Sequence, residues 1–125
     1  MRYLTDYKRA AGLGSAHGGT HHLWHMQLSS AALVILVPLF IFTFGSILGS
    51  SHEDVLDYYS RPIPAVIAGL TLVVGLLHFY SGAQILIEDY SKGLTRRVLI
   101  LVAAIFSYTS IALGLFALVK LALQG

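Results

Sequence analysis

One histidine, His78, lies deep in an apolar stretch of this sequence and is followed at regular spacing by residues that could support chemistry. On a helix of about 3.6 residues per turn, His78, Gly82, Ile85 and Asp89 share one face. Gly82 leaves room for a flat, bulky group beside the imidazole, and Tyr90 adds a phenol next to the Asp89 carboxylate. An imidazole at membrane depth is costly without a partner, so His78 is a candidate functional residue. The alternative is a packed histidine that hydrogen-bonds to a neighbouring helix.

The composition places this stretch in a membrane. Of the 125 residues, 56% are hydrophobic and 11% are charged, with a mean hydropathy of +0.74, whereas soluble domains carry about 25% charged residues. Three segments without Asp, Glu, Lys or Arg exceed the ~20 residues that a bilayer requires, namely 28–48, 62–87 and 98–119. We therefore expect an all-α protein with an amino-terminal tail over 1–26 and a membrane domain over 27–122, with transmembrane helices at about 27–48, 62–88 and 97–120.

The tail is rich in glycine, and its composition favours an irregular or weakly helical segment. It also holds four histidines, His17, His21, His22 and His25. The pattern His21-His22-x-x-His25 lacks the carboxylate of a zincin-type helix motif, so zinc binding is disfavoured. Trp24 fits the headgroup layer just before the first span.

The first span begins with polar residues and has a proline near its middle. Pro38 predicts a kink. Gln27, Ser29 and Ser30 either solvate the helix end or form the wall of a pocket at headgroup level, and solvation is the favoured interpretation. After this span, the acidic segment 50–61 predicts a short amphipathic turn.

Charge and cysteine content exclude several functions and predict a topology. The absence of cysteine excludes disulfides, iron–sulfur ligation by this chain and covalent c-type haem attachment, so a redox centre would have to use histidine. A net charge of +2 without a dense basic cluster gives no support for nucleic-acid binding. Six basic residues flank one side of the predicted spans, Arg2, Lys8, Arg9, Lys92, Arg96 and Arg97, against Arg61 and Lys120 on the other. The positive-inside rule then predicts a cytoplasmic amino terminus and a periplasmic carboxyl terminus.

The spacing His-x3-Gly-x6-Asp-Tyr, formed by His78, Gly82, Asp89 and Tyr90 in the second of three spans, resembles the D-type membrane-anchor subunit of succinate dehydrogenase. The segments Gly12-Leu-Gly-Ser15, Gly19-Thr20, His22 and Trp24 resemble its alphaproteobacterial branch.

The resemblance implies that His78 ligates the iron of a haem b shared with a second anchor subunit, with Gly82 packing beside the haem. It also implies that Asp89 and Tyr90 lie beside a ubiquinone site. The family commonly has an arginine before a small hydroxylated residue at the start of the first span, where this chain has Gln27 before Leu28-Ser29. Glutamine offers only neutral donors, so no role is carried over to Gln27 or Ser29.

The chemistry is consistent with this resemblance. A haem b iron can take two neutral imidazoles, and one histidine from each of two subunits places the porphyrin at their interface. The small residues Ala103, Ser107, Ser110 and Gly114 of the third span would admit another helix or a porphyrin edge.

The resemblance implies an inner-membrane protein that is not catalytic alone. Its implied partners are a C-type anchor protein of the cytochrome b556 type, an iron–sulfur subunit, a flavoprotein and the lipid bilayer. The alternative is a haem-free structural anchor or assembly protein. A small transporter is disfavoured because no carboxylate lies deep in a span.

Overall fold

The computed structural model describes residues 5–7 and 16–124, with the side chains of 5–7 and 21–124. The second range forms α2 (Ala16–Ile47), α3 (His52–Ser60), α4 (Pro62–Tyr90) and α5 (Gly93–Gln124). Of these helices, α2, α4 and α5 are long and apolar enough to cross a membrane. The predicted all-α class with three spans is confirmed.

The helices extend beyond the predicted spans, most of all at the start of α2. This helix begins at Ala16 rather than near Gln27 and continues to Ile47, because each residue added to an existing helix gains a backbone hydrogen bond. Residues 16–26 are therefore helical, whereas residues 1–4 and 8–15 of the predicted tail, including the Gly12–Ser15 motif, lie outside the described residues. The second and third spans extend to Tyr90 and Gln124.

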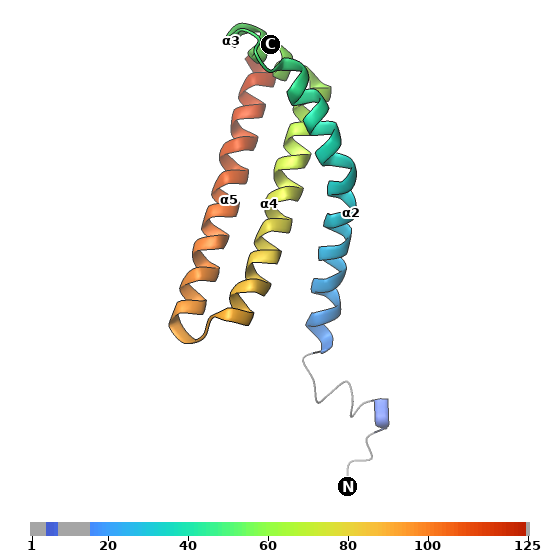
Figure 1. Ribbon diagram of the computed structural model, residues 1–125, viewed down its shortest axis with the longest axis vertical. Helices are drawn as coiled ribbons and strands as arrows, with labels where there is room; N and C mark the ends of the chain where they lie inside the picture. The colour runs from blue at the N-terminus through green and yellow to red at the C-terminus, as the bar shows by residue number, and fades with distance from the viewer. Residues whose placement is uncertain (1–4, 8–15, 125) are drawn as a thin grey trace.

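Helix α4 lies between α2 and α5 and packs against both (Figure 1). Helix α3 lies across one end of the bundle, against α4 and the end of α5, while the turn between α4 and α5 lies at the other end. α2 remains helical through Pro38, and its second half leans toward α3 and α4 in Figure 1. This arrangement makes α4, which carries His78, the central helix of the bundle.

The connections between helices are short, and the residue that begins each helix suits its position. Ser51 begins α3 with a capping box, in which its hydroxyl accepts from the Asp54 amide at 3.2 Å and its own amide donates to the Asp54 carboxylate at 3.3 Å. Pro62 opens α4, where a missing amide proton costs nothing. Gly93 opens α5 at a φ of 61°, a conformation that glycine adopts without strain.

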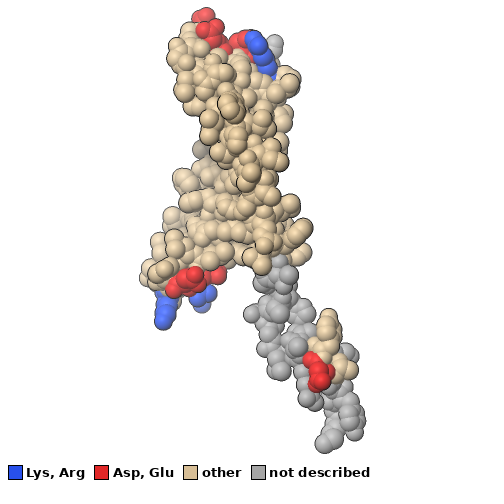
Figure 2. Space-filling view, turned by 45° about the vertical axis from the view of Figure 1, so that its right-hand side comes forward, with Lys and Arg blue, Asp and Glu red and all other residues tan. Residues whose placement is uncertain are grey.

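The bundle has almost no interior of its own. Among the described side chains no large hydrophobic residue is buried, and the buried residues of the helices are Pro64, Gly69 and Ser107. Charged residues gather at the ends of the bundle, and the wall between them on the face shown in Figure 2 carries none. Its apolar sides are therefore suited to lipid and to neighbouring subunits.

Candidate functional site

His78 lies near the middle of α4, on the face that packs against α2. Gly75 and Gly82 flank it by about one turn on either side: a Cβ built on Gly75 would lie 3.9 Å from Leu33 Cδ2, and one built on Gly82 would lie 3.5 Å from Met26 Cε. The two glycines that flank the imidazole therefore both face α2. The space beside Gly82 is bordered by Met26, whose flexible, unbranched side chain can repack around a neighbouring group.

The His78 imidazole contacts a hydroxyl on the opposite helix. Ser29 Oγ lies 2.8 Å from His78 Nδ1, in a contact that is partly buried. The same Ser29 hydroxyl donates to the Met26 carbonyl at 2.9 Å. The interpretation that Ser29 only solvates the helix end is therefore wrong, whereas the exposed Ser30, which also donates to the Met26 carbonyl, fits that interpretation.

These two contacts favour one tautomer of His78. When the Met26 carbonyl accepts the one proton of the Ser29 hydroxyl, Ser29 Oγ is left to accept a hydrogen bond from His78 Nδ1–H. The reverse assignment would leave the lone pairs of the Ser29 and Met26 oxygens facing each other across 2.9 Å. Nε2 consequently retains its lone pair, and no described side chain hydrogen-bonds to it. A neutral imidazole in this state is a metal ligand or a hydrogen-bond acceptor.

A half-open cavity of about 470 Å³ lies beside this contact, between α2, α4 and α5. Ser29 lines it, together with two tyrosines whose rings are 6.0 Å apart, Tyr80 and Tyr108. The remaining lining residues are His25, Leu28, Ala32, Val74, Leu77 and Ser81. None of Tyr80, Ser81 and Tyr108 was predicted from the sequence as a site residue. The helical spacing of Val74, Leu77 and Ser81 on α4 was the available signal, but only the packing of three helices makes it a cavity wall.

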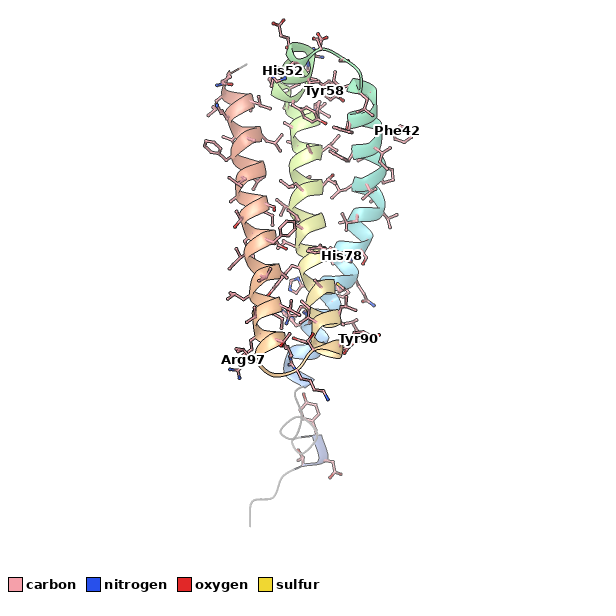
Figure 3. All side chains as sticks on the ribbon, turned by 60° about the vertical axis from the view of Figure 1, so that its left-hand side comes forward. Phe42, His52, Tyr58, His78, Tyr90 and Arg97 are labelled. Carbon is pink, nitrogen blue, oxygen red and sulfur yellow. The ribbon has the colours of Figure 1, made fainter. Side chains whose placement is uncertain are left out.

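The predicted quinone residues lie at the end of α4, away from His78. Asp89 and Tyr90 are exposed, with 84% of the Tyr90 surface accessible, and Figure 3 places Tyr90 near the same end of the bundle as Arg97. Twelve helical residues separate Tyr90 from His78, a rise of about 18 Å. Within this chain, the motif is therefore divided between two locations. His78 and Gly82 face α2, and Asp89 and Tyr90 lie at the end of α4.

The amino-terminal histidines that the structure describes do not gather with acidic residues. The rings of His21 and His25 meet edge to face at 5.4 Å. Over 5–7 and 21–124, no three His, Asp or Glu side chains are placed to share a metal ion. His17 lies outside the described side chains.

Three membrane-length helices with a histidine at mid-span and little buried interior define a helical membrane subunit. Comparisons with known proteins assign it more narrowly. The family described as the succinate dehydrogenase/fumarate reductase transmembrane subunit matches residues 1–120. The chain therefore belongs to this family, as a membrane anchor subunit of succinate dehydrogenase.

Curated relatives match along nearly the whole chain. The succinate dehydrogenase hydrophobic membrane anchor subunit of Paracoccus denitrificans is 45% identical over 98% of this chain and 95% of the relative. The subunit of the same name from Rickettsia bellii is 30% identical over 87% of this chain and 88% of the relative. No solved structure matches the chain.

Proposed function

We propose that this protein anchors a succinate:ubiquinone oxidoreductase in the membrane and that His78 would supply one ligand to the iron of a haem b. The other ligand comes from a second anchor protein, of the cytochrome b556 type. When bound, the haem provides a one-electron carrier within the membrane. This chain is not catalytic alone: its own residues hold and orient the group.

The contact between Ser29 and His78 is the observation that carries the proposal. Ligation requires an imidazole nitrogen with a free lone pair, and Nε2 meets this requirement when Nδ1 carries the proton and donates to Ser29 Oγ, which lies 2.8 Å away. In most proteins, the other ring N–H of a ligating histidine donates a hydrogen bond to a carbonyl, a carboxylate or water, and here Ser29 Oγ would be that acceptor. The glycine at position 82 supports the proposal further, because only the terminal methyl of Met26 borders the space next to it.

The exposed apolar surface supports a role inside a larger assembly. A chain whose described helices bury no large hydrophobic side chain gains little stability from packing against itself alone. The second anchor protein and the bilayer would cover the helix faces, and the flavoprotein and iron–sulfur subunits would dock at one end of the bundle.

The end of α4 supports a quinone site shared with those partners. The Tyr90 phenol can donate a hydrogen bond to a quinone oxygen, and the neighbouring Asp89 carboxylate, exposed to water, can relay the protons that reduction consumes. Glu88 is engaged by the Gln84 side-chain amide at 2.9 Å, which leaves Asp89 as the freer carboxylate. Because Tyr90 is exposed, partner subunits must supply the other walls of this site.

We place the protein in the bacterial inner membrane, with the end of α4 on the cytoplasmic side. Lys92, Arg96 and Arg97 follow that end closely, and Arg2, Lys8 and Arg9, which lie outside the described residues, precede the first span. The positive-inside rule favours this orientation.

A haem-free structural anchor is the second candidate. The Ser29–His78 contact is also compatible with this candidate, because a packed histidine at membrane depth needs a hydrogen-bond partner, but packing alone leaves His78 Nε2 without a partner among the described residues.

The absorbance spectrum of the purified complex separates the two candidates. In the His78→Leu variant, the low-spin haem b bands should disappear or shift, while succinate oxidation with a soluble artificial acceptor continues. His52→Leu, in α3 at one end of the bundle and away from His78 (Figure 3), is the matched control and should keep the wild-type spectrum. An unchanged haem spectrum in His78→Leu would assign His78 to packing and support the haem-free anchor.

A further inference from the structure

We propose that Ser29 is a positioning residue for the haem, which it affects only through His78. In this assignment the Ser29 hydroxyl holds the His78 imidazole with Nδ1 protonated and Nε2 free for the iron. The inference rests on the proposed function of His78 and adds a residue of α2 to a site otherwise located on α4.

The Ser29 hydroxyl also has a partner on its own helix. It donates to the Met26 carbonyl, one turn earlier on α2, at 2.9 Å. With the proton bound there, the oxygen lone pairs remain available to α4, where His78 Nδ1 approaches to 2.8 Å. Met26, Ser29 and His78 thus form one directed chain of hydrogen bonds from a backbone carbonyl to the imidazole.

The contact between Ser29 and His78 is partly buried beside the cavity. Leu28, Ala32, Val74 and Leu77 line this cavity together with the polar side chains of His25, Tyr80, Ser81 and Tyr108. A hydrogen bond is electrostatically stronger in such surroundings than in water, and a donor left without a partner there is costly. Without the Ser29 hydroxyl, the imidazole can rotate or exchange its proton between Nδ1 and Nε2, and either change weakens Nε2 as a ligand.

The acceptor should also change the electronic character of the ligand. A hydrogen bond from Nδ1–H to an acceptor raises the basicity of a ligating imidazole. A more basic ligand favours the oxidised, ferric iron. Ser29 should therefore hold the haem reduction potential below the value it would have with an unpartnered His78.

Ser30 provides a matched control next to Ser29. Its hydroxyl also donates to the Met26 carbonyl at 2.9 Å, but it is exposed and makes no described contact with α4. Removing the Ser30 hydroxyl therefore shows how the haem responds when a serine hydroxyl is lost at this level of α2 and no hydrogen bond to His78 is removed.

The test compares Ser29→Ala, Ser29→Val, Ser29→Thr and Ser30→Ala in the purified four-subunit complex, by redox titration of the haem and by measurement of haem retention. Val and Thr have nearly the same shape, and only Thr keeps the hydroxyl. We expect Ala and Val at position 29 to raise the haem midpoint potential and to weaken haem binding by about 10–100-fold. Ser29→Thr should restore both properties toward wild type, and Ser30→Ala should match wild type.

Equal potential and haem retention in Ser29→Ala and wild type, or a shift of equal size in Ser30→Ala, would overturn the inference. So would failure of both Ser29→Ala and Ser29→Val to assemble while Ser29→Thr assembles, because Ser29 would then be required for folding. A His78→Leu variant measured in parallel separates this result from failure of the proposed function. If that variant changes the haem and the position-29 variants do not, His78 remains a ligand and only the role of Ser29 is lost.

Discussion

Leu72 of α4 lies directly against Gly114 of α5. A Cβ built on Gly114 would overlap Leu72 Cδ2 and would lie within 3.6 Å of both Leu72 Cγ and Cδ1. The helices approach this closely because glycine presents no side chain, as small residues do in membrane bundles. Of the two partners that the sequence allowed for the small residues of α5, another helix or a porphyrin edge, α4 is the one that packs against Gly114.

This contact predicts that Gly114→Ala destabilises the bundle. The added methyl group forces Leu72 into another rotamer, and such overpacking costs about 1–3 kcal/mol. Thermal unfolding of the complex in detergent should therefore shift to lower temperature. Gly45→Ala on α2 is the control, since a Cβ there meets no atom within 4 Å. Equal stability of both variants would show that α4 and α5 do not pack closely at Gly114.

A second prediction concerns Ser107, which is fully buried on α5 and whose hydroxyl has no hydrogen-bond partner among the described residues. An unpaired buried hydroxyl loses its interaction with water and gains nothing in return. Ser107→Ala should therefore leave stability unchanged or raise it by about 1 kcal/mol, measured by the same unfolding experiment. Ser46→Ala, which removes an exposed hydroxyl, should change stability by less than about 0.5 kcal/mol. A loss of more than about 1 kcal/mol in Ser107→Ala would reveal a partner for this hydroxyl in the complex.

A third prediction concerns Tyr90. The Tyr90→Phe substitution keeps the ring and removes the hydroxyl, so it isolates a hydrogen bond worth roughly 1–3 kcal/mol if partner subunits bury the site. Reduction of ubiquinone should fall about 5- to 150-fold, while electron transfer from succinate to a soluble artificial acceptor stays normal.

Tyr59→Phe provides the control for this measurement, because Tyr59 lies in α3 at the other end of the bundle. It should leave both activities unchanged. If Tyr90→Phe also matches wild type in both assays, Tyr90 is an anchor at the membrane interface and takes no part in quinone reduction.

A fourth prediction concerns topology. With the α4–α5 turn in the cytoplasm, the end of α5 and helix α3 face the periplasm, since both lie at the opposite end of the bundle (Figure 1). Alkaline phosphatase fused after Gly125 should be active, and the same fusion in the turn after Lys92 should be inactive. The reverse pattern would invert the proposed orientation and move Tyr90 to the periplasmic side.

Some features of the bundle could have been inferred by counting along the chain. Ser29 precedes the predicted end of the first span at residue 48 by 19 residues, and His78 follows the predicted start of the second at residue 62 by 16 residues. At about 1.5 Å per residue, these positions differ in depth by about 4–5 Å. The sequence thus contained a signal that Ser29 and His78 lie at the same level, but it did not show that they face each other.

The sequence by itself determined the number of long apolar helices and the one histidine placed deep within a predicted span, because hydropathy and charge are local properties that a bilayer selects directly. Tertiary structure alone decided that His78 meets Ser29, 49 residues away along the chain, that Gly82 faces Met26, and that Tyr80 and Tyr108 border one cavity. These contacts depend on how each helix is rotated about its own axis. In a membrane that rotation is set by close packing and interhelical hydrogen bonds, because apolar side chains are as well solvated by lipid as by one another.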